Sequence, residues 1–317
     1  MTAADSLIAD IGGTNARFAL VGAEGPAHSE RVLRCADYPT LTEAARAYLA
    51  GQGVRPLNAA FALAGPVTGD RIRMTNLPWE FSIRDVRDAL GLDRLDVIND
   101  FTAVALGIPE LGAADKVQVG DGEPVAGYPV GVLGPGSGLG VSALIPGPGG
   151  WTALATEGGH VTMAPITDRE SAVLAQLRKT YEHVSAERLV CGPGLVNLYD
   201  TLAYLDGLEP EKLTAAEISD RALARRDPVC VEALEMFCAM LGTVAGNLAL
   251  SIGARGGVFI AGGIIPRFLT AFTHSRFRKR FVEKGRMRDF LGPIPTYVVT
   301  HPYPAFLGLA AQVRRPA

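Results

Sequence analysis

Asn99 and Asp100 place a carboxylate directly after the apolar run Leu95–Ile98. In α/β proteins the ends of strands carry much of the chemistry, and phosphoryl transfer to an alcohol needs a carboxylate that accepts the hydroxyl proton. The other interpretation of Asp100 is a helix N-cap, because Asn and Asp are preferred at that position. Taken alone, the two residues leave both interpretations open.

Two glycine-rich turns favour the first interpretation. Gly12-Gly13-Thr14 and the segment 134–140 each separate two apolar runs, which predicts strand, hairpin, strand. Backbone N–H groups at such turns cradle phosphates. One hairpin of this kind is better explained as a simple turn. Two of them, each opening one half of the chain, favour a nucleotide held between two lobes and a catalytic base at Asp100.

The chain lacks the sequences of the common nucleotide-binding loops. No G-x-x-x-x-G-K-[ST] occurs, which excludes a Walker-type P-loop. The glycines of 134–140 do not complete G-x-G-x-x-G, and a strand-like run follows them instead of a helix, which excludes the dinucleotide fingerprint. Protein-kinase signatures are missing as well.

Apolar runs and helix signals predict the elements that position these residues. Their order gives two α/β halves, each opening with a glycine-turned hairpin. The predicted elements are a strand at Asn58–Leu63, a helix at Ser82–Leu90 with a capping box (Ser82, Asp85) and a stop at Gly91, a helix with a capping box (Thr167, Glu170) that reaches about Tyr181, a long apolar helix opened by Asp227-Pro228 and ended by Gly253, and a buried strand at Gly257–Ala261.

Composition excludes several classes of protein. With 317 residues, 37 of them Gly, and a hydrophobic fraction of 48%, the chain can bury a large core in about two domains. Its 30 basic and 33 acidic residues predict no nucleic-acid partner. The cysteines at 35, 191, 230 and 238 form no C-x-x-C pair, which predicts reduced, buried thiols and neither a zinc site nor disulfides.

The stretch Met236–Ile252 carries no charge and approaches the length of a membrane span. Glu232 and Glu235 just upstream, and Asn247 inside, favour a helix buried in a core instead. The N-terminal sequence MTAADSLIAD lacks the basic and apolar regions of a signal peptide. We therefore expect no membrane association and a cytoplasmic location.

Three motifs, in order along the chain, resemble those of the sugar kinase, Hsp70 and actin superfamily. They are Asp10-Ile11-Gly12-Gly13-Thr14-Asn15-Ala16-Arg17 (first phosphate motif), Gly136-Ser137-Gly138-Leu139-Gly140 (second phosphate motif) and Gly256–Arg267, which contains Gly262-Gly263 (adenosine motif). The resemblance implies a two-lobed actin-like (ribonuclease H-like) α/β fold, with a mixed sheet flanked by helices in each lobe and the active site in the interlobe cleft. We expect a small lobe of residues 1–110 plus 301–317, including a helix from about Tyr303, and a large lobe of residues 111–300.

Further motifs resemble the bacterial glucokinase family over nearly the whole chain. They are Gly65-Pro66-Val67-Thr68-Gly69, Thr75-Asn76-Leu77-Pro78-Trp79, Asn99-Asp100-Phe101-Thr102-Ala103, Glu157-Gly158-Gly159-His160, Ser185-Ala186-Glu187-Arg188 and Gly192-Pro193-Gly194-Leu195. The related repressor/ORF/kinase group carries a cysteine-rich zinc motif near its sugar-binding histidine, whereas no such motif accompanies His160. This departure favours the zinc-free glucokinases.

The resemblance implies that the γ-phosphate of ATP passes to the 6-hydroxyl of glucose, the first step of glycolysis. Asp100 is then the general base. The sugar-binding residues are Asn99, Glu157, His160, Glu187, Gly65 and Pro66, and the ATP-binding residues are Asp10, Gly12, Gly13, Thr14, Gly136, Ser137, Gly138, Gly262 and Gly263. Asp10 would orient the water shell of the Mg²⁺ that accompanies ATP, and no metal site made of protein ligands is implied. The family also implies a homodimer.

Two other functions are compatible with the same fold. A sugar-binding regulator would need a helix-turn-helix ahead of the nucleotide domain, and Asp10 begins that domain almost at once. An actin- or Hsp70-like ATPase has no use for the sugar-directed carboxylates. His160 alone is more often structural, and Glu187 alone fits a solvated helix residue, so both assignments depend on the resemblance. The sequence leaves open the strictness for glucose over other hexoses, the use of ATP against ADP or polyphosphate, and allosteric control.

Overall fold

A computed structural model of the chain describes residues 5–74 and 77–315. The chain divides into two compact units. The first consists of Met1–Gly112, Trp151–Ala155 and His301–Ala317, and the second of Ala113–Gly150 and Thr156–Thr300. Thr75 and Asn76, which belong to one of the motifs quoted above, lie outside the described residues. The α/β class expected from the sequence is confirmed, because both main sheets are mixed and flanked by helices.

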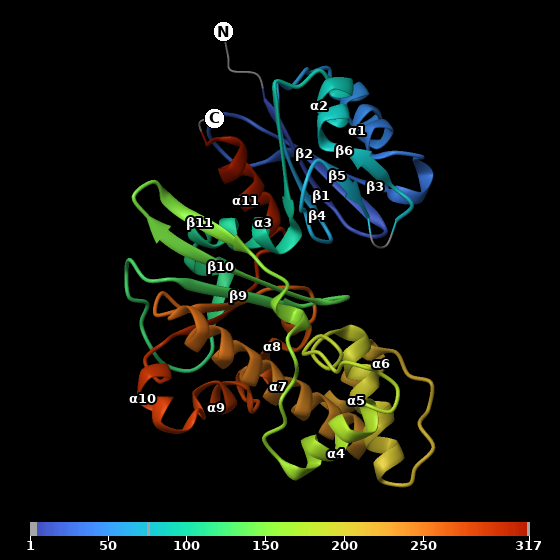
Figure 1. The fold of residues 1–317 in the computed structure, drawn as a ribbon, viewed down its shortest axis with the longest axis vertical. Coiled ribbons are helices and arrows are strands. Elements are labelled where there is room, and N and C mark those ends of the chain that lie inside the picture. Colours follow the sequence, from blue (N-terminus) through green and yellow to red (C-terminus); the bar gives the residue numbers. More distant parts are fainter. Residues whose placement is uncertain (1–4, 75–76, 316–317) are drawn as a thin grey trace. The chain divides into compact units, whose positions relative to one another are not determined.

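The first unit contains a five-stranded sheet in the order β3-β2-β1-β4-β7 (Figure 1). β2 is antiparallel to β1 and β3, whereas β4 runs parallel to β1 and β7. The strands are β1 (Ser6–Ile11), β2 (Asn15–Val21), β3 (His28–Arg34), β4 (Asn58–Leu63) and β7 (Arg94–Asn99), beside a separate pair of β5 (Arg71–Arg73) and β6 (Glu80–Ser82). The helices are α1 (Leu41–Ala50), α2 (Ile83–Leu90), α3 (Asp100–Gly107) and α11 (Pro304–Val313).

Helices cover both faces of this sheet (Figure 1). On one face, alternate residues of β1 such as Leu7 and Ile11 share a core with Tyr48 of α1, as the two-residue alternation of a strand requires. On the other face, α11 packs against α3, β1 and β4. The two helices approach closely because of glycine: a Cβ on Gly308 would lie 1.8 Å from the carbonyl oxygen of Ala103.

The second unit is built on a six-stranded sheet in the order β11-β10-β9-β12-β13-β8, of which residues 151–155 in β11 are grouped with the first unit. β9 and β10 form an antiparallel hairpin, and β12 lies parallel to β9 and β13. The strands are β8 (Lys116–Gln118), β9 (Val130–Pro135), β10 (Leu139–Gly147), β11 (Gly150–Ala155), β12 (Val258–Ile260) and β13 (Thr296–Val299). The helices are α4 (Asp168–Leu177), α5 (Gly192–Leu205), α6 (Ala215–Leu223), α7 (Pro228–Ile252), α8 (Leu269–Thr273), α9 (Phe277–Val282) and α10 (Arg288–Leu291).

The long apolar helix is α7, and its predicted ends are confirmed. The Asp227 carboxylate caps the first turn by accepting the N–H groups of Val229 and Cys230, and Gly253 ends the helix in the left-handed region with φ of 64°. By length and composition α7 is a candidate membrane span, but 78% of its most apolar stretch is buried. It packs against α5, α6 and α9 in the core of the second unit, which supports the buried-helix interpretation.

The helix predicted from Thr167 differs from expectation in one capping contact and at its C-terminal end. Thr167 caps it as predicted, but the reciprocal half of the capping box is wrong, because the Glu170 carboxylate accepts the N–H of Ile166 (2.7 Å) and forms a buried ion pair with Arg280. A buried charge needs such a partner, and this one comes from α9. The helix also ends at Leu177 and not near Tyr181, because the residues after it form a turn in which Lys179 and Thr180 make i→i+3 hydrogen bonds.

Candidate active site

Asp10, Gly65 and Asn99 lie at one edge of the first sheet. Because β1, β4 and β7 are parallel, their carboxyl ends share an edge, and the register pairs Ile11 with Leu63 and Leu63 with Asn99. Asp10 directly precedes Ile11, and Gly65 follows the end of β4. The edge therefore gathers the residues of the first unit that the sequence assigns to the base, the sugar and the nucleotide.

Asn99, and not Asp100, caps α3. Its Oδ1 accepts hydrogen bonds from the backbone N–H groups of Phe101 (2.9 Å) and Thr102 (3.1 Å). Asp100 is the first residue of the helix, and its Oδ1 accepts the Phe101 N–H (2.8 Å). The N-cap interpretation of Asp100 is therefore wrong. A carboxylate in the first helical turn is stabilised in its charged form by the helix dipole.

Gly65 is tied to Asn99, whose Nδ2 donates a hydrogen bond to the Gly65 carbonyl (3.2 Å). The φ of Gly65 is 133°, a backbone conformation that favours glycine. Pro66 follows on the exposed surface of the loop. An amide side chain carries two N–H donors, so the Gly65 carbonyl uses only one of the donors of Asn99.

Asp10 faces Arg17 across the β1–β2 hairpin, with 3.4 Å between its Oδ2 and the Nη1 of Arg17. The Asp10 side chain is 25% exposed. Burial raises the pKa of Asp10 above its ordinary value, and Arg17 lowers it by a smaller amount. The carboxylate thus lies at the strand end with Arg17 as a cationic neighbour that offsets part of the cost of its charge.

The turn after Asp10 is held by a hydrogen bond within it and by hydrogen bonds from Cys35. The Gly12 N–H donates to the Asn15 carbonyl (3.0 Å), and Cys35 donates its own N–H to the Thr14 carbonyl (2.9 Å) and its thiol to the Gly12 carbonyl (3.7 Å). Gly13 is half-buried and Thr14 is exposed. The turn is therefore fixed in shape while its tip is open to a ligand.

The second sheet has a comparable edge. β12 is parallel to β9, with Ile260 paired to Leu133, so the segments 134–140 and 261–263 follow neighbouring strand ends. Gly262, with φ of 86°, lies against this loop, where a Cβ would stand 2.5 Å from the Pro135 carbonyl oxygen. Gly136 and Gly138 close the loop through an N–H···O bond of 2.7 Å. The side chain of Ser137 and the glycine at 263 are exposed.

Glu157, His160 and Glu187 converge in the second unit. The His160 Nε2 is 4.0 Å from a Glu157 oxygen, and its Nδ1 is 3.9 Å from the Glu187 Oε1. The side chains of Glu157 and His160 are 56% exposed and that of Glu187 is 30% exposed. A one-turn 3-10 helix (Gly158–His160) brings the first two together, and the Glu187 N–H donates to the Gly159 carbonyl (2.9 Å). The structure thus places two carboxylates around one imidazole.

Sequence reasoning missed the backbone that supports this cluster. Glu187 accepts a hydrogen bond from the Leu139 N–H (2.8 Å), and a Cβ on Gly159 would lie 2.0 Å from the Leu139 carbonyl oxygen. The only signal in the sequence was the pair Gly158-Gly159, which marks a close backbone approach without naming the partner.

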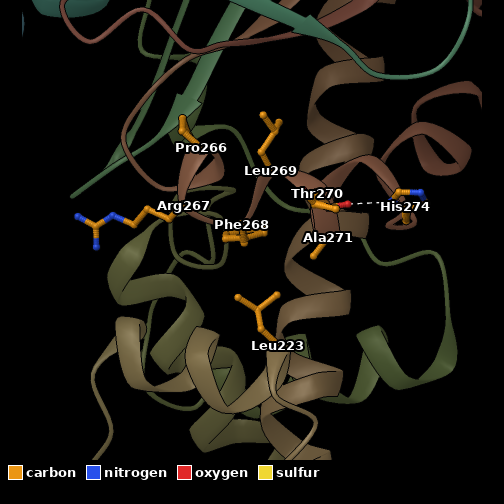
Figure 2. A pocket seen from close by; sticks show the side chains of 8 residues that line it. All are labelled: Leu223, Pro266, Arg267, Phe268, Leu269, Thr270, Ala271 and His274. Carbon is orange, nitrogen blue, oxygen red and sulfur yellow. Dashed lines mark hydrogen bonds between the residues drawn. The ribbon is translucent and has the colours of Figure 1, made fainter.

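A cavity of about 530 Å³ opens beside the C-terminal end of the adenosine motif (Figure 2). Pro266 and Arg267 of that motif line it, with Phe268 and, from α6, Leu223. The remaining lining residues are Leu269, Thr270, Ala271 and His274. The His274 Nδ1 lies 2.8 Å from the Thr270 carbonyl oxygen. The walls are mostly apolar, which suits a flat organic group.

All four cysteines are free, and their burial confirms the prediction that they are buried. Within residues 5–74 and 77–315, no group of three or more His, Cys, Asp or Glu side chains is arranged to hold a metal ion.

Comparison with known proteins gives one family. Residues 7–316 match the family described as Glucokinase. The glucokinase of Paramagnetospirillum magneticum is 57% identical over 313 residues, which is 98% of each chain, and that of Neisseria gonorrhoeae is 51% identical over 306 residues, 96% of this chain and 93% of the relative. The crystal structure of a glucokinase from an Antarctic psychrotroph is 38% identical with a TM-score of 0.89, covering 98% of both chains.

Proposed function

Since the chain belongs to the glucokinase family and shares its activity, the transfer of phosphate from ATP to glucose, we propose that the carboxyl edges of its two sheets divide this reaction between them. The first unit supplies the base and the second the carboxylates that bind sugar hydroxyls. Each unit supplies one glycine loop for the phosphates of ATP. The observation that carries the proposal is the register of β1, β4 and β7, which gathers Asp10, Gly65 and Asn99-Asp100.

Asp100 acts as the general base. Its carboxylate accepts the proton of the 6-hydroxyl while that oxygen bonds to the γ-phosphorus and the bond from phosphorus to the ADP oxygen breaks. A base must be charged before the transfer, and the position at the start of α3 favours the charged form. Because Asn99 supplies the helix cap, the helix does not depend on Asp100 for it.

Asn99, Glu157, His160 and Glu187 bind the other hydroxyls of the sugar. A hydroxyl both donates and accepts, and carboxylates paired with an imidazole and an amide offer both functions. The second N–H of Asn99 serves a sugar oxygen while the first holds the Gly65 carbonyl. A buried polar group left unpaired costs about 1–3 kcal/mol, which is the basis for rejecting an epimer.

Asp10 and the glycine loops hold the phosphates. Mg²⁺ keeps several of its waters and is bound through one or two carboxylates together with substrate phosphates, so the single partly exposed carboxylate of Asp10 fits it. When bound there, magnesium would supply neutralisation of the charge on the phosphates. We assign the remaining phosphate contacts to backbone N–H groups of the two loops other than those of Gly12 and Gly136, which already donate to the Asn15 and Gly138 carbonyls.

The cavity beside Pro266 and Arg267 takes the adenosine of ATP. Its lining residues Pro266 and Arg267 come shortly after Gly262 and Gly263 in the sequence, and these glycines follow the strand next to β9 and its phosphate loop. Its apolar walls, including Phe268, suit a purine. The support for this assignment is the continuity of the adenosine motif with the cavity.

The finer architecture follows the family. Residues 1–110 plus 301–317 form the small lobe and 111–300 the large lobe, the active site lies in the cleft between them, and closure excludes water as a competing acceptor. The enzyme is a cytoplasmic homodimer. Support for these assignments comes from the resemblance of the motifs and from family membership.

The test is a coupled turnover assay with a panel of hexoses and phosphoryl donors, with magnesium withheld in one arm. We expect ATP consumption that depends strictly on glucose and on magnesium, and a rate that falls for epimers of glucose. ATP hydrolysis at equal rates with and without sugar would support an ATPase of the same fold and would contradict the proposal. Measuring glucose 6-phosphate directly separates phosphoryl transfer from uncoupled hydrolysis.

A further inference from the structure

The two oxygens of the Glu187 carboxylate face different segments. Oε2 accepts the N–H of Leu139 (2.8 Å), which belongs to the glycine loop at 134–140, and Oε1 is 3.9 Å from the Nδ1 of His160. A hydrogen bond from an N–H group to a charged acceptor is about twice as strong as a neutral one. One side chain therefore reaches both the loop assigned to phosphate and the cluster assigned to sugar.

The lack of a side chain at Gly138 allows the Glu187 carboxylate to reach the loop. A Cβ at Gly138 would stand 2.5 Å from Oε2 of Glu187 and 3.2 Å from its carboxyl carbon. Any side chain at 138 would push Glu187 away from the Leu139 N–H. The lack of a Cβ at this position therefore makes room for the Glu187 carboxylate, in addition to letting a phosphate approach the backbone.

The backbone around Glu187 joins the same two segments. Its N–H donates to the Gly159 carbonyl (2.9 Å), its carbonyl accepts the Cys191 thiol (2.9 Å), and the next residue, Gly192, donates its N–H to the Gly136 carbonyl (2.9 Å). The turn that carries Glu187 is therefore fixed to the sugar cluster at one end and to the phosphate loop at the other. All of these residues belong to the second unit.

We propose that Glu187 is a positioning residue for the phosphate loop as well as a sugar ligand, and that it couples the binding of the two substrates within the second unit. This inference rests on the proposed function. A sugar hydroxyl that donates to Oε1 fixes the rotamer of the side chain, and the fixed rotamer holds Oε2 on the Leu139 N–H. Glucose therefore raises the affinity for nucleotide, and by linkage nucleotide raises the affinity for glucose by the same factor.

The coupling is measured by calorimetric titration of AMPPNP with magnesium into the full-length protein, without glucose and at saturating glucose. In the wild type we expect AMPPNP to bind at least about fivefold more tightly with glucose, within the usual range of such couplings. Glu187→Gln places an amide nitrogen against either the Leu139 N–H or the sugar. We expect its affinity for AMPPNP in the absence of sugar to fall about tenfold and the effect of glucose to disappear.

Two further variants distinguish a positioning role of Glu187 from a general loss of structure in the site. Glu157→Gln is the matched control, because in the described residues Glu157 contacts His160 but makes no hydrogen bond to the loop at 134–140. It should weaken glucose binding and leave the sugar-free AMPPNP affinity within about twofold. Gly138→Ala keeps every sugar-binding side chain in the sequence but displaces the Glu187 carboxylate from the Leu139 N–H. It should reproduce the loss of sugar-free AMPPNP affinity, which keeps the proposal testable if Glu187→Gln does not fold.

Unchanged sugar-free affinity and unchanged coupling in both Glu187→Gln and Gly138→Ala would overturn the inference. So would an equal loss in Glu157→Gln. These results are distinguishable from failure of the proposed function, in which the wild-type protein itself would bind no AMPPNP or no glucose.

Discussion

Asn99 and Asp100 are neighbours with different tasks. The amide of Asn99 accepts two N–H groups at the start of α3 and donates to the Gly65 carbonyl, which makes it the structural partner of the pair. The carboxylate of Asp100 is not required as a cap. A substitution at Asp100 is therefore expected to affect chemistry much more than folding.

Asp100→Asn should keep glucose affinity within a small factor and reduce turnover by about 10²- to 10⁴-fold, the usual effect of losing a general base. Steady-state kinetics and calorimetric titration of glucose measure the two quantities. Asp93→Asn, an exposed acid just before the other end of β7, is the control and should retain turnover within about twofold. Full activity in Asp100→Asn would remove Asp100 from the base role.

The raised pKa of Asp10 predicts how the free energy of unfolding depends on pH. Because burial raises its pKa above 3.8, the folded state holds this proton more tightly than the unfolded chain does. Ionisation of Asp10 therefore lowers the free energy of unfolding as the pH rises through the interval between 3.8 and the raised value.

Asp10→Asn removes this dependence. Without nucleotide, the variant should be more stable than the wild type at pH 7, and its advantage should shrink as the pH falls toward 3.8. Urea unfolding at several pH values from about 4 to 8, compared between the two proteins, tests the sign. A variant less stable than the wild type at pH 7 would show that the Arg17 pair outweighs the cost of burial. Activity with magnesium and ATP should be lost in the same variant.

At the scale of elements, glycines set how closely helices pack. A Cβ on Gly308 of α11 would meet the Ala103 carbonyl oxygen of α3 at 1.8 Å and the Gly107 nitrogen at 2.8 Å. Backbone atoms cannot move aside as the end of a flexible side chain can. The pair α3 and α11 must separate or unwind locally to accept any larger residue.

Gly308→Ala should destabilise the protein by about 3 kcal/mol, at the upper end of what overpacking costs. Gly51→Ala is the matched control in the first unit, since its Cβ would meet nothing closer than 3.6 Å and Gly51 already has a right-handed helical conformation. The control should be neutral or slightly stabilising. Chemical denaturation of both variants tests the comparison, and equal stability of the two would refute the packing argument.

Local sequence signals predicted the helices and strands well, but they did not predict contacts between residues far apart in the sequence. The hairpins around Gly12 and the 134–140 loop, the strand Asn58–Leu63 and the limits of α7 follow from runs, turns and caps that involve only neighbouring residues. The Glu170 side chain was misassigned because its partner, Arg280, comes from a helix more than a hundred positions later. The bond from Leu139 to Glu187 was missed for the same reason.

At the scale of the whole molecule, family membership shows which reaction the chain catalyses, and the topology of the two sheets determines where the site residues lie. The sequence predicted strand ends for Asp10 and Asn99, but only the parallel register of three strands brings these ends to one edge. No spacing in a single sequence fixes that register, because β4 and β7 are joined to β1 by long connections.

The oligomeric state is a prediction at this scale. We expect a homodimer, with a solution mass twice that of one chain, by size-exclusion chromatography with light scattering. Twofold-symmetric dimers are by far the commonest soluble homo-oligomers, which agrees with the expected mass. A mass of one chain at every concentration would contradict the prediction, and comparing turnover across the same concentrations would show whether assembly matters for activity.

The position of α11 has a consequence for synthesis on the ribosome. The helix belongs to the end of the chain, yet it covers β1 and β4, which are made first. The second unit forms almost entirely from the continuous stretch 113–300, so its core can assemble as soon as that stretch emerges. The first sheet, in contrast, lacks the cover of α11 over β1 and β4 until residue 313 has been released. The part of the protein that is translated first is therefore the part that finishes folding last.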